Sequence, residues 1–119
     1  MRIEKELMRG AGPIAILKLL ERHELYGYEL IERLARQSNG VLTMGESTLY
    51  PLLYNLESKG LIEGIWREAD SGRRRKYYRL TKKGRGHLER SAREWQRLAE
   101  TMQTLGIVSA RLAGEGVPA

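Results

Sequence analysis

Two groups of side chains in this 119-residue sequence have the types and spacing needed to bind a polyanion. The first is a run of four cations: Arg73, Arg74, Arg75 and Lys76. The second is a set of uncharged side chains in one short stretch: Ser47, Thr48, Tyr50, Pro51, Tyr54, Asn55 and Ser58. Guanidinium and ammonium groups bind phosphate oxygens, whereas hydroxyl, amide and ring groups can contact base edges and the thymine methyl. Together they predict binding to duplex DNA.

The positive charge of the chain is concentrated in one segment. Between positions 67 and 83 there are eight basic and two acidic residues, a surplus of six that equals the formal net charge of the whole chain, +6. A basic protein with no particular anionic partner would spread this excess over its surface, whereas a local surplus is typical of an element that contacts a polyanion. A solvated basic hairpin is the alternative interpretation.

Catalysis, metal binding and a cofactor are not expected. The sequence has no cysteine, and its two histidines, His23 and His87, have no spacing that would form a metal site. Gly84 and Gly86 lack the remainder of a phosphate-binding loop. The residue types of an enzyme site therefore do not converge anywhere in the sequence.

The uncharged set lies on a predicted helix between Gly45 and Ile62. Leu49, Leu52, Leu53 and Leu56 are spaced as the apolar stripe of an amphipathic helix, so the uncharged set would face outward. With Thr48 as the N-cap, Pro51 would fall at the third helical position, where a missing N–H costs no helical bond. A start nearer Glu46 would require a kink at Pro51. Lys59 and Gly60 mark the end of this helix.

The surrounding sequence predicts three helical segments before it and a hairpin after it. A short arm from Ile3 to Arg9 would end at Gly10, a buried helix would begin at Pro13, and a third helix would run from the Tyr26–Tyr28 region to Gly40. Strands are predicted from Leu61 to Arg67 and from Arg74 to Leu80, joined by a turn at 69–72, with Trp66 as a structural aromatic. This pattern predicts a mainly α fold with a small β-hairpin (α+β), a winged helix-turn-helix domain over residues 1–81.

A long helix is predicted over residues 82–113, with Thr81 as its N-cap, followed by a flexible tail at 114–119. Its apolar residues recur at heptad spacing, namely Leu88, Trp95, Leu98, Met102 and Leu105. One small core cannot easily cover such a stripe, so we expect this helix to form the interface of a homodimer. Packing against the first helices of the same chain is the alternative.

Four blocks in this order resemble the PadR family of bacterial transcriptional regulators. They are YGYEL at 26–30, STLYPLLYNLESKGLI at 47–62, GRRRKYYRLTKKG at 72–84, and the tryptophan at position 95. The resemblance covers most of the chain, and the length is similar to that of the short branch of the family, in which a single C-terminal helix completes the dimer. It implies a homodimeric repressor that binds a pseudo-palindromic operator in double-stranded DNA. It also implies release by a small aromatic ligand, for which Trp95 would line the pocket unless it is only a packing residue.

A winged-helix module for protein–protein contacts, without DNA or ligand regulation, remains the competing function. In that case the outward helix would meet another protein, and the basic hairpin would serve solubility. The sequence has no apolar run of 18 residues that could cross a membrane and no signal-peptide core at its N-terminus. A cytoplasmic location without membrane contact is therefore expected.

Overall fold

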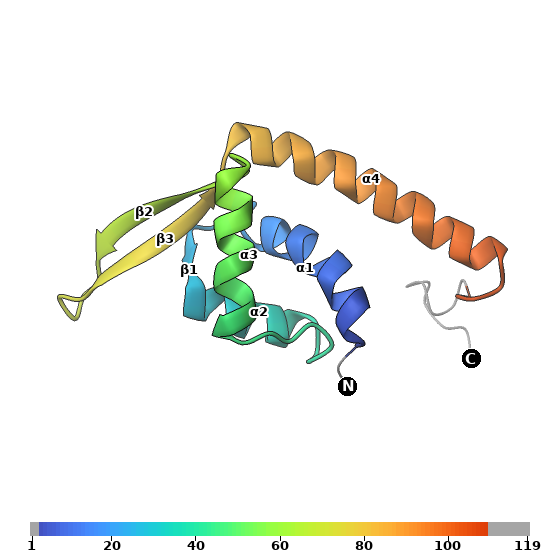
Figure 1. Ribbon diagram of the computed structural model, residues 1–119, viewed down its shortest axis with the longest axis horizontal. Helices are drawn as coiled ribbons and strands as arrows, with labels where there is room; N and C mark the ends of the chain where they lie inside the picture. The colour runs from blue at the N-terminus through green and yellow to red at the C-terminus, as the bar shows by residue number, and fades with distance from the viewer. Residues whose placement is uncertain (1–2, 110–119) are drawn as a thin grey trace. The chain divides into compact units, whose positions relative to one another are not determined.

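The computed structural model describes residues 3–109 as four α-helices and a three-stranded antiparallel sheet (Figure 1). The elements follow in the order α1 (Lys5–Leu19), β1 (Leu25–Tyr26), α2 (Gly27–Gln37), α3 (Glu46–Ser58), β2 (Ile62–Glu68), β3 (Arg74–Leu80) and α4 (Lys82–Thr104). This arrangement confirms the predicted winged helix-turn-helix fold of the α+β class. The predicted flexible tail, 114–119, lies outside the described residues.

The chain divides into two compact units, of which one runs to Leu88 and the other begins at Glu89. The first unit contains α1, α2, α3, the sheet and the beginning of α4, and thus extends beyond the predicted boundary at residue 81. Its core is formed by apolar side chains from every one of these elements. Ile16 and Leu17 come from α1, Leu30 from α2, Leu53 from α3 and Leu88 from α4.

The N-terminal arm and the next predicted segment form one continuous helix, α1, so the predicted break at Gly10–Gly12 is wrong. Pro13 lies inside this helix, where it removes only the one backbone bond that its missing N–H would have donated to Arg9. Gly12 is buried, and a Cβ added there would lie 3.6 Å from Met44 Cε and 3.7 Å from Leu52 Cδ2. The glycine therefore marks a close packing site rather than the end of a helix.

The sheet contains one strand that the sequence patterns did not predict. β1 is only two residues long and pairs with β3, with Leu25 opposite Tyr78 and Tyr26 opposite Tyr77. The Tyr26 backbone N–H also donates to Glu29 Oε1 at 3.1 Å, which satisfies one backbone group at the start of α2. β1 thus ties the beginning of α2 to the hairpin.

The hairpin of β2 and β3 extends from the three helices α1–α3, with its turn at the far end (Figure 1). Its register pairs Ile62 with Leu80 and Glu68 with Arg74, close to the predicted strand limits. Gly72 lies in the turn at φ 84°, a conformation that favours glycine. Ile62, Tyr78 and Leu80 are buried at the inner end, so the hairpin is rooted in the core.

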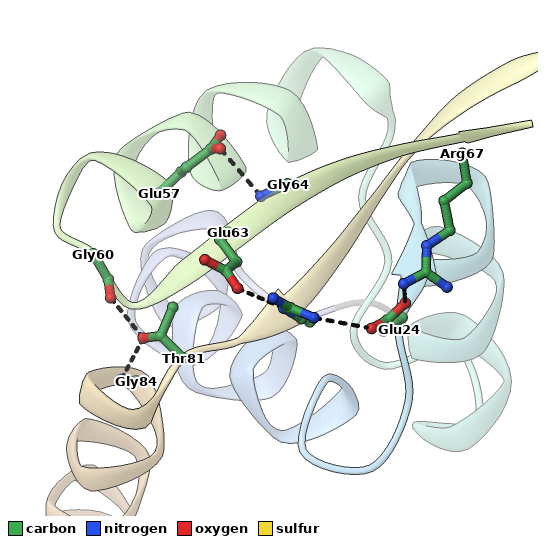
Figure 2. A network of polar contacts seen from close by, with 9 residues as sticks. Glu24, Glu57, Gly60, Glu63, Gly64, Arg67, Thr81 and Gly84 are labelled. Atoms are coloured by element: carbon green, nitrogen blue, oxygen red, sulfur yellow. Dashed lines mark hydrogen bonds and ion pairs between the residues drawn. The ribbon is translucent and has the colours of Figure 1, made fainter.

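The start of α4 is fixed by the predicted cap. Thr81 Oγ1 accepts a hydrogen bond from the Gly84 N–H at 2.9 Å and donates to the Gly60 carbonyl at 2.6 Å (Figure 2). Gly84 is buried so closely against the chain just before β2 that a Cβ there would overlap the Leu61 carbonyl oxygen. These contacts join the end of α3, the start of β2 and the start of α4.

The second unit consists of α4 from Glu89 onward and the residues that close its C-terminus. The helix ends at Thr104 because Gly106 adopts φ 80° and Ile107 N–H donates back to the Met102 carbonyl at 2.9 Å. It is therefore shorter than the predicted segment 82–113, of which residues 110–113 lie outside the described residues.

Candidate nucleic-acid interface

Helix α3 has the two faces that the sequence predicts for the segment between Gly45 and Ile62. Leu49, Leu53 and Leu56 are buried, and Leu52 is half-buried against the core. The seven residues predicted to face outward are all exposed: Ser47, Thr48, Tyr50, Pro51, Tyr54, Asn55 and Ser58. Tyr54 is the most open of the aromatic ones, with 74% of its surface accessible. The result is a polar but uncharged strip along one side of α3.

The helix begins earlier than the preferred N-cap, Thr48, would allow. Gly45 is the N-cap, and its carbonyl accepts from Thr48 N–H at 3.2 Å and from Leu49 N–H at 3.0 Å. Pro51 therefore lies in the second turn, where its ring nitrogen cannot donate to the Ser47 carbonyl. The Thr48 prediction is wrong because these bonds to Gly45 add a turn in front of it. Ser47 and Thr48 thereby become part of the exposed helical surface.

Tyr50 leaves the strip and leans toward the start of α2. A Cβ at Gly27 would overlap the Tyr50 hydroxyl, so the absence of a side chain at residue 27 is what lets the tyrosine lie there. Tyr50 is still 45% exposed and lines a cleft beside the hairpin. Ser58, another member of the strip, donates to the Tyr54 carbonyl of its own helix at 2.8 Å.

Glu57 connects α3 to both hairpin strands. Its Oε2 accepts from the Gly64 backbone N–H of β2 at 3.2 Å (Figure 2), and its Oε1 lies 3.1 Å from Lys76 Nζ of β3. Lys76 also lies over the Tyr78 ring, 5.4 Å from the centroid. Burial raises the pKa of the Tyr78 phenol, against the opposite effect of the Lys76 ammonium, so the ring stays neutral under the cation. Lys76, predicted as a phosphate-binding cation, is thus held by a carboxylate.

A second network holds two further arginines of the hairpin. Arg67 donates to Glu24 at 2.8 Å (Figure 2). Arg79 lies 3.7 Å from the other oxygen of the same carboxylate. Arg79 also donates to Glu63, and this hydrogen bond is the main reason why the pKa of its guanidinium is raised. Of the eight cations in the basic segment, Arg67, Lys76 and Arg79 are therefore engaged by carboxylates of the chain itself.

Arg73, Arg74 and Arg75 differ from these three. Within residues 3–109, no carboxylate lies within ion-pairing distance of their guanidinium groups. Arg74 lies over the Trp66 ring, 5.5 Å from its centroid, and Arg75 lies over the Tyr26 ring at 4.4 Å. Aromatic faces attract these cations without neutralising their charge.

Trp66 has a different setting from the structural one that was predicted. It is 58% exposed, because it lies on β2 beyond Gly64, where the hairpin has left the core. The register carries the signal that would have indicated this position: Ile62, Gly64 and Trp66 share one face of β2, and Trp66 stands opposite the charged Lys76. Trp66 is thus an aromatic residue of the surface that the analysis of the sequence missed.

A cleft of about 310 Å³ lies between α3 and the hairpin. Its lining includes Tyr50 from α3, Trp66 from β2, and Arg74, Arg75 and Lys76 from β3. The cleft brings together Tyr50 of the uncharged set on α3 and three cations of the run Arg73–Lys76, together with Trp66.

The second unit carries the predicted apolar stripe of α4. Trp95 is 42% exposed, Leu98 45% and Leu105 67%, whereas Met102 is half-buried. Leu88, also predicted for the interface, is only 4% exposed and belongs to the core of the first unit, so it is reassigned from the interface to the core.

Metal binding and membrane insertion find no structural basis in the part of the chain that is described. Between residues 3 and 109, no three His, Cys, Asp or Glu side chains are grouped so that they could hold a metal ion. In the same range, no helix is both long and apolar enough to cross a membrane.

The sequence and the fold are both similar to those of known regulators. The model of the transcriptional regulator PadR-like family matches residues 16–90. A transcriptional regulator of Mycobacterium tuberculosis is 36% identical over 95 residues, which cover 80% of this chain and 85% of that protein.

Two solved structures show the same arrangement. A PadR family transcriptional regulator from Eggerthella lenta has a TM-score of 0.73 and 37% identity, with coverage of 84% of this chain and 85% of that one. A PadR-like transcriptional regulator from Bacillus cereus has a TM-score of 0.75 and 32% identity, with coverage of 85% and 96%.

Proposed function

The chain belongs to the PadR-like family of transcriptional regulators, and on that basis we propose that it represses transcription in the cytoplasm as a homodimer bound to a pseudo-palindromic operator. Members of this family are DNA-binding regulators rather than enzymes, in agreement with the expectation of no catalytic site. The finer parts of the proposal concern how DNA is read, how the dimer forms and whether a ligand releases the protein from DNA.

The observation that carries the DNA-binding role is the contrast between α3 and the adjacent hairpin. An exposed strip without charge lies on α3, and three arginines without carboxylate partners among the described residues lie at the start of the return strand. Base edges are read by hydrogen bonding and apolar contact, whereas phosphates are bound by charge. Ser47, Tyr54, Asn55 and Ser58 would therefore enter the major groove, and Arg73, Arg74 and Arg75 would contact the backbone.

The strip contains no arginine or lysine, so it cannot make the common bidentate contact to guanine. Hydroxyl and amide groups can bind adenine or thymine edges, and the Tyr54 ring offers apolar area to a thymine methyl. We expect modest base readout, supplemented by the shape and deformability of the operator.

The experiment that tests this role begins with selection of bound duplexes from a random-sequence library. The affinity of the full chain for the enriched duplex is then measured from low to moderate salt, where log K should fall linearly, by about 0.9 per phosphate contacted. Tyr54→Ala and Asn55→Ala should each reduce the preference for the enriched over random duplex by on the order of 1 to 3 kcal/mol. A protein–protein module would give neither enrichment nor this salt dependence.

The dimer part of the proposal rests on the exposed stripe Trp95, Leu98 and Leu105, with Met102 beside it. Burial of such a stripe against a second copy would remove apolar area from water that the single chain leaves open. Leu98→Glu combined with Leu105→Glu should give a monomer in sedimentation velocity. Arg93→Glu combined with Gln96→Glu, which lie away from the stripe, should leave the dimer intact. A monomeric wild type would contradict this part of the proposal.

The ligand part rests on Trp95, which is large, aromatic and half-exposed in the single chain. In a Trp66→Phe background, planar aromatic compounds should quench the Trp95 fluorescence and release the enriched duplex. If no compound of a broad panel does either, Trp95 is a packing residue of the dimer and release by ligand is excluded from the proposal.

A further inference from the structure

The cleft between α3 and the hairpin has the chemistry of an anion site. It is lined by three cationic side chains and four aromatic rings, and no carboxylate of the described residues lines it. Its volume of about 310 Å³ is at the lower end of ligand-sized clefts. A cation would be repelled and an apolar molecule would gain nothing from the charged groups, so the lining favours an occupant with negative charge.

The two arginines of the cleft are oriented rather than neutralised. Arg74 lies over Trp66 and Arg75 over Tyr26, with the guanidinium carbon 5.5 Å and 4.4 Å from the ring centroids. A guanidinium held over a ring keeps its N–H edge available for two parallel hydrogen bonds, which is the geometry that phosphate oxygens accept. Lys76 differs, because Glu57 already compensates its charge at 3.1 Å. The two guanidiniums are therefore the groups available to an anion.

Tyr50 adds a neutral donor from α3. It reaches the cleft only because Gly27 has no side chain to occupy that space. Its position joins α3 to the phosphate-binding side of the hairpin, whereas its neighbours Ser47 and Tyr54 remain on the exposed strip. The cleft therefore has lining residues both from α3, which carries the strip, and from the hairpin.

We infer that the cleft seats one backbone phosphodiester of the bound DNA strand, with Arg74 and Arg75 as bidentate donors, the Tyr50 hydroxyl as a third donor, and the Trp66 ring under Arg74. This inference rests on the proposed DNA-binding function. It goes further in assigning DNA contact to Tyr50 and Trp66, and in assigning the two arginines to one defined phosphate rather than to the backbone in general.

The test is a phosphate scan with the full chain and the enriched duplex. Single phosphates are replaced one at a time by neutral methylphosphonates, and the affinity of each duplex is measured for the wild type and for Arg74→Gln. At one position in each half-site, neutralisation should weaken the wild type about tenfold, because charge-assisted hydrogen bonds are lost, and should weaken Arg74→Gln by a smaller factor, because only Arg75 and Tyr50 still contact that phosphate. At every other position, both proteins should lose affinity equally.

Two variants and a spectroscopic signal separate contact from general charge. Arg36→Gln removes an exposed cation of α2 that pairs with Glu32 on its own helix, and it should not reproduce the profile of Arg74→Gln. Trp66→Leu keeps the charge of Arg74 and should weaken binding about threefold without a change in salt slope. In a Trp95→Phe background, Trp66 emission should change with the unmodified duplex and not with the duplex neutralised at that one phosphate.

Each result decides a distinct point. Equal losses for wild type and Arg74→Gln at every phosphate would overturn the cleft assignment and leave the DNA-binding function intact. An equal change of the Trp66 emission with the unmodified duplex and with the duplex neutralised at that one phosphate would also overturn the assignment. A wild type that enriches no duplex would overturn the proposed function, and the cleft assignment with it.

Discussion

The hairpin contains two sets of cations that differ in what surrounds them. At the arginine end, defined as Arg73–Arg75, the guanidinium groups lie in the turn or over aromatic rings, without a carboxylate partner among the described residues. At the anchored end, defined as Lys76–Leu80, Lys76 is held by Glu57 and Arg79 by Glu63 and Glu24. One strand, β3, thus passes from one setting to the other within two residues.

The difference shows that a count of positive charges overstates the charge available to DNA. Cations of the anchored end already have intramolecular partners, so a phosphate would have to displace a carboxylate from them. The arginine end needs no such exchange, and its charge costs the fold little because it remains near water. Changes at the arginine end should therefore alter DNA binding, and changes at the anchored end should alter stability.

The largest effect is expected when the arginine end is neutralised. The triple variant Arg73→Gln, Arg74→Gln, Arg75→Gln should weaken all duplex binding by on the order of 10² to 10³. Its slope of log K against log salt should be lower by about 1.8, since Arg74 and Arg75 share one phosphate, Arg73 contacts another, and each lost phosphate contact removes about 0.9. Fluorescence anisotropy across a salt series measures both, and urea unfolding should show a change in stability below about 0.5 kcal/mol.

A matched control removes three exposed cations that pair with acids three or four residues away in the sequence: Arg9, Lys18 and Arg36, each changed to Gln. The total charge falls by the same amount in both proteins. The salt slope of this control should stay within error of the wild type. Equal slopes for the two triple variants would mean that net charge, rather than the arginine end, drives binding.

The next effect concerns the junction after the anchored end, where β3 is followed by α4. Gly84→Ala should lower the free energy of unfolding by about 2 to 3 kcal/mol, because the new methyl group would overlap the Leu61 carbonyl and forces the backbone to move. Gly10→Ala is the matched control, since nothing lies within 4 Å of a Cβ there, inside helix α1. It should raise stability by about 0.5 to 1 kcal/mol through helix propensity. Urea denaturation measures both, and the same sign for the two changes would contradict the packing argument.

Local patterns in the sequence predicted the elements whose causes are local. The apolar stripe of α3, the turn at 69–72 and the Thr81 cap depend on residues a few positions apart, and the structure has all three. The break predicted at Gly10–Gly12 failed because Gly12 is buried inside α1 beside Met44 and Leu52, which lie far along the chain. β1 was missed for the same reason, since two residues carry no periodicity and its existence depends on β3.

In the candidate interface, too, features with local causes could be predicted and features that depend on distant residues could not. Exposure of the α3 strip follows from helical spacing, so it was predictable. The pairing of Lys76 with Glu57 spans 19 residues, and the contact of Tyr50 with Gly27 joins two different helices. Residue type alone gave no sign that Lys76 would be compensated and Arg74 would not. Charge patterns therefore locate a basic element, but partner carboxylates decide which of its cations are available.

The smallest effect is expected when the carboxylate partner of Lys76 is removed. This change tests the difference between the two ends directly, because it leaves a cation of the anchored end without a compensating carboxylate, as at the arginine end. Glu57→Gln keeps the size of the side chain and an oxygen that can accept from Gly64, but it no longer compensates Lys76. The pair is about one-third exposed, so the loss of stability should remain below about 1 kcal/mol. DNA affinity should rise a few-fold, and the salt slope should steepen by up to about 0.9 if Lys76 reaches a phosphate.

The pairing of Lys76 with Glu57 also determines the DNA affinity that we expect when Lys76 itself is changed. In the wild type, Lys76→Gln should change DNA affinity much less than Arg74→Gln, although both remove one positive charge from neighbouring positions of β3. In the Glu57→Gln background, Lys76→Gln should cancel the gain in affinity and return the salt slope to its wild-type value. If Lys76→Gln and Arg74→Gln instead weaken binding equally in the wild type, then a phosphate displaces Glu57 on binding, and the pairing seen in the free protein does not limit which cations DNA uses.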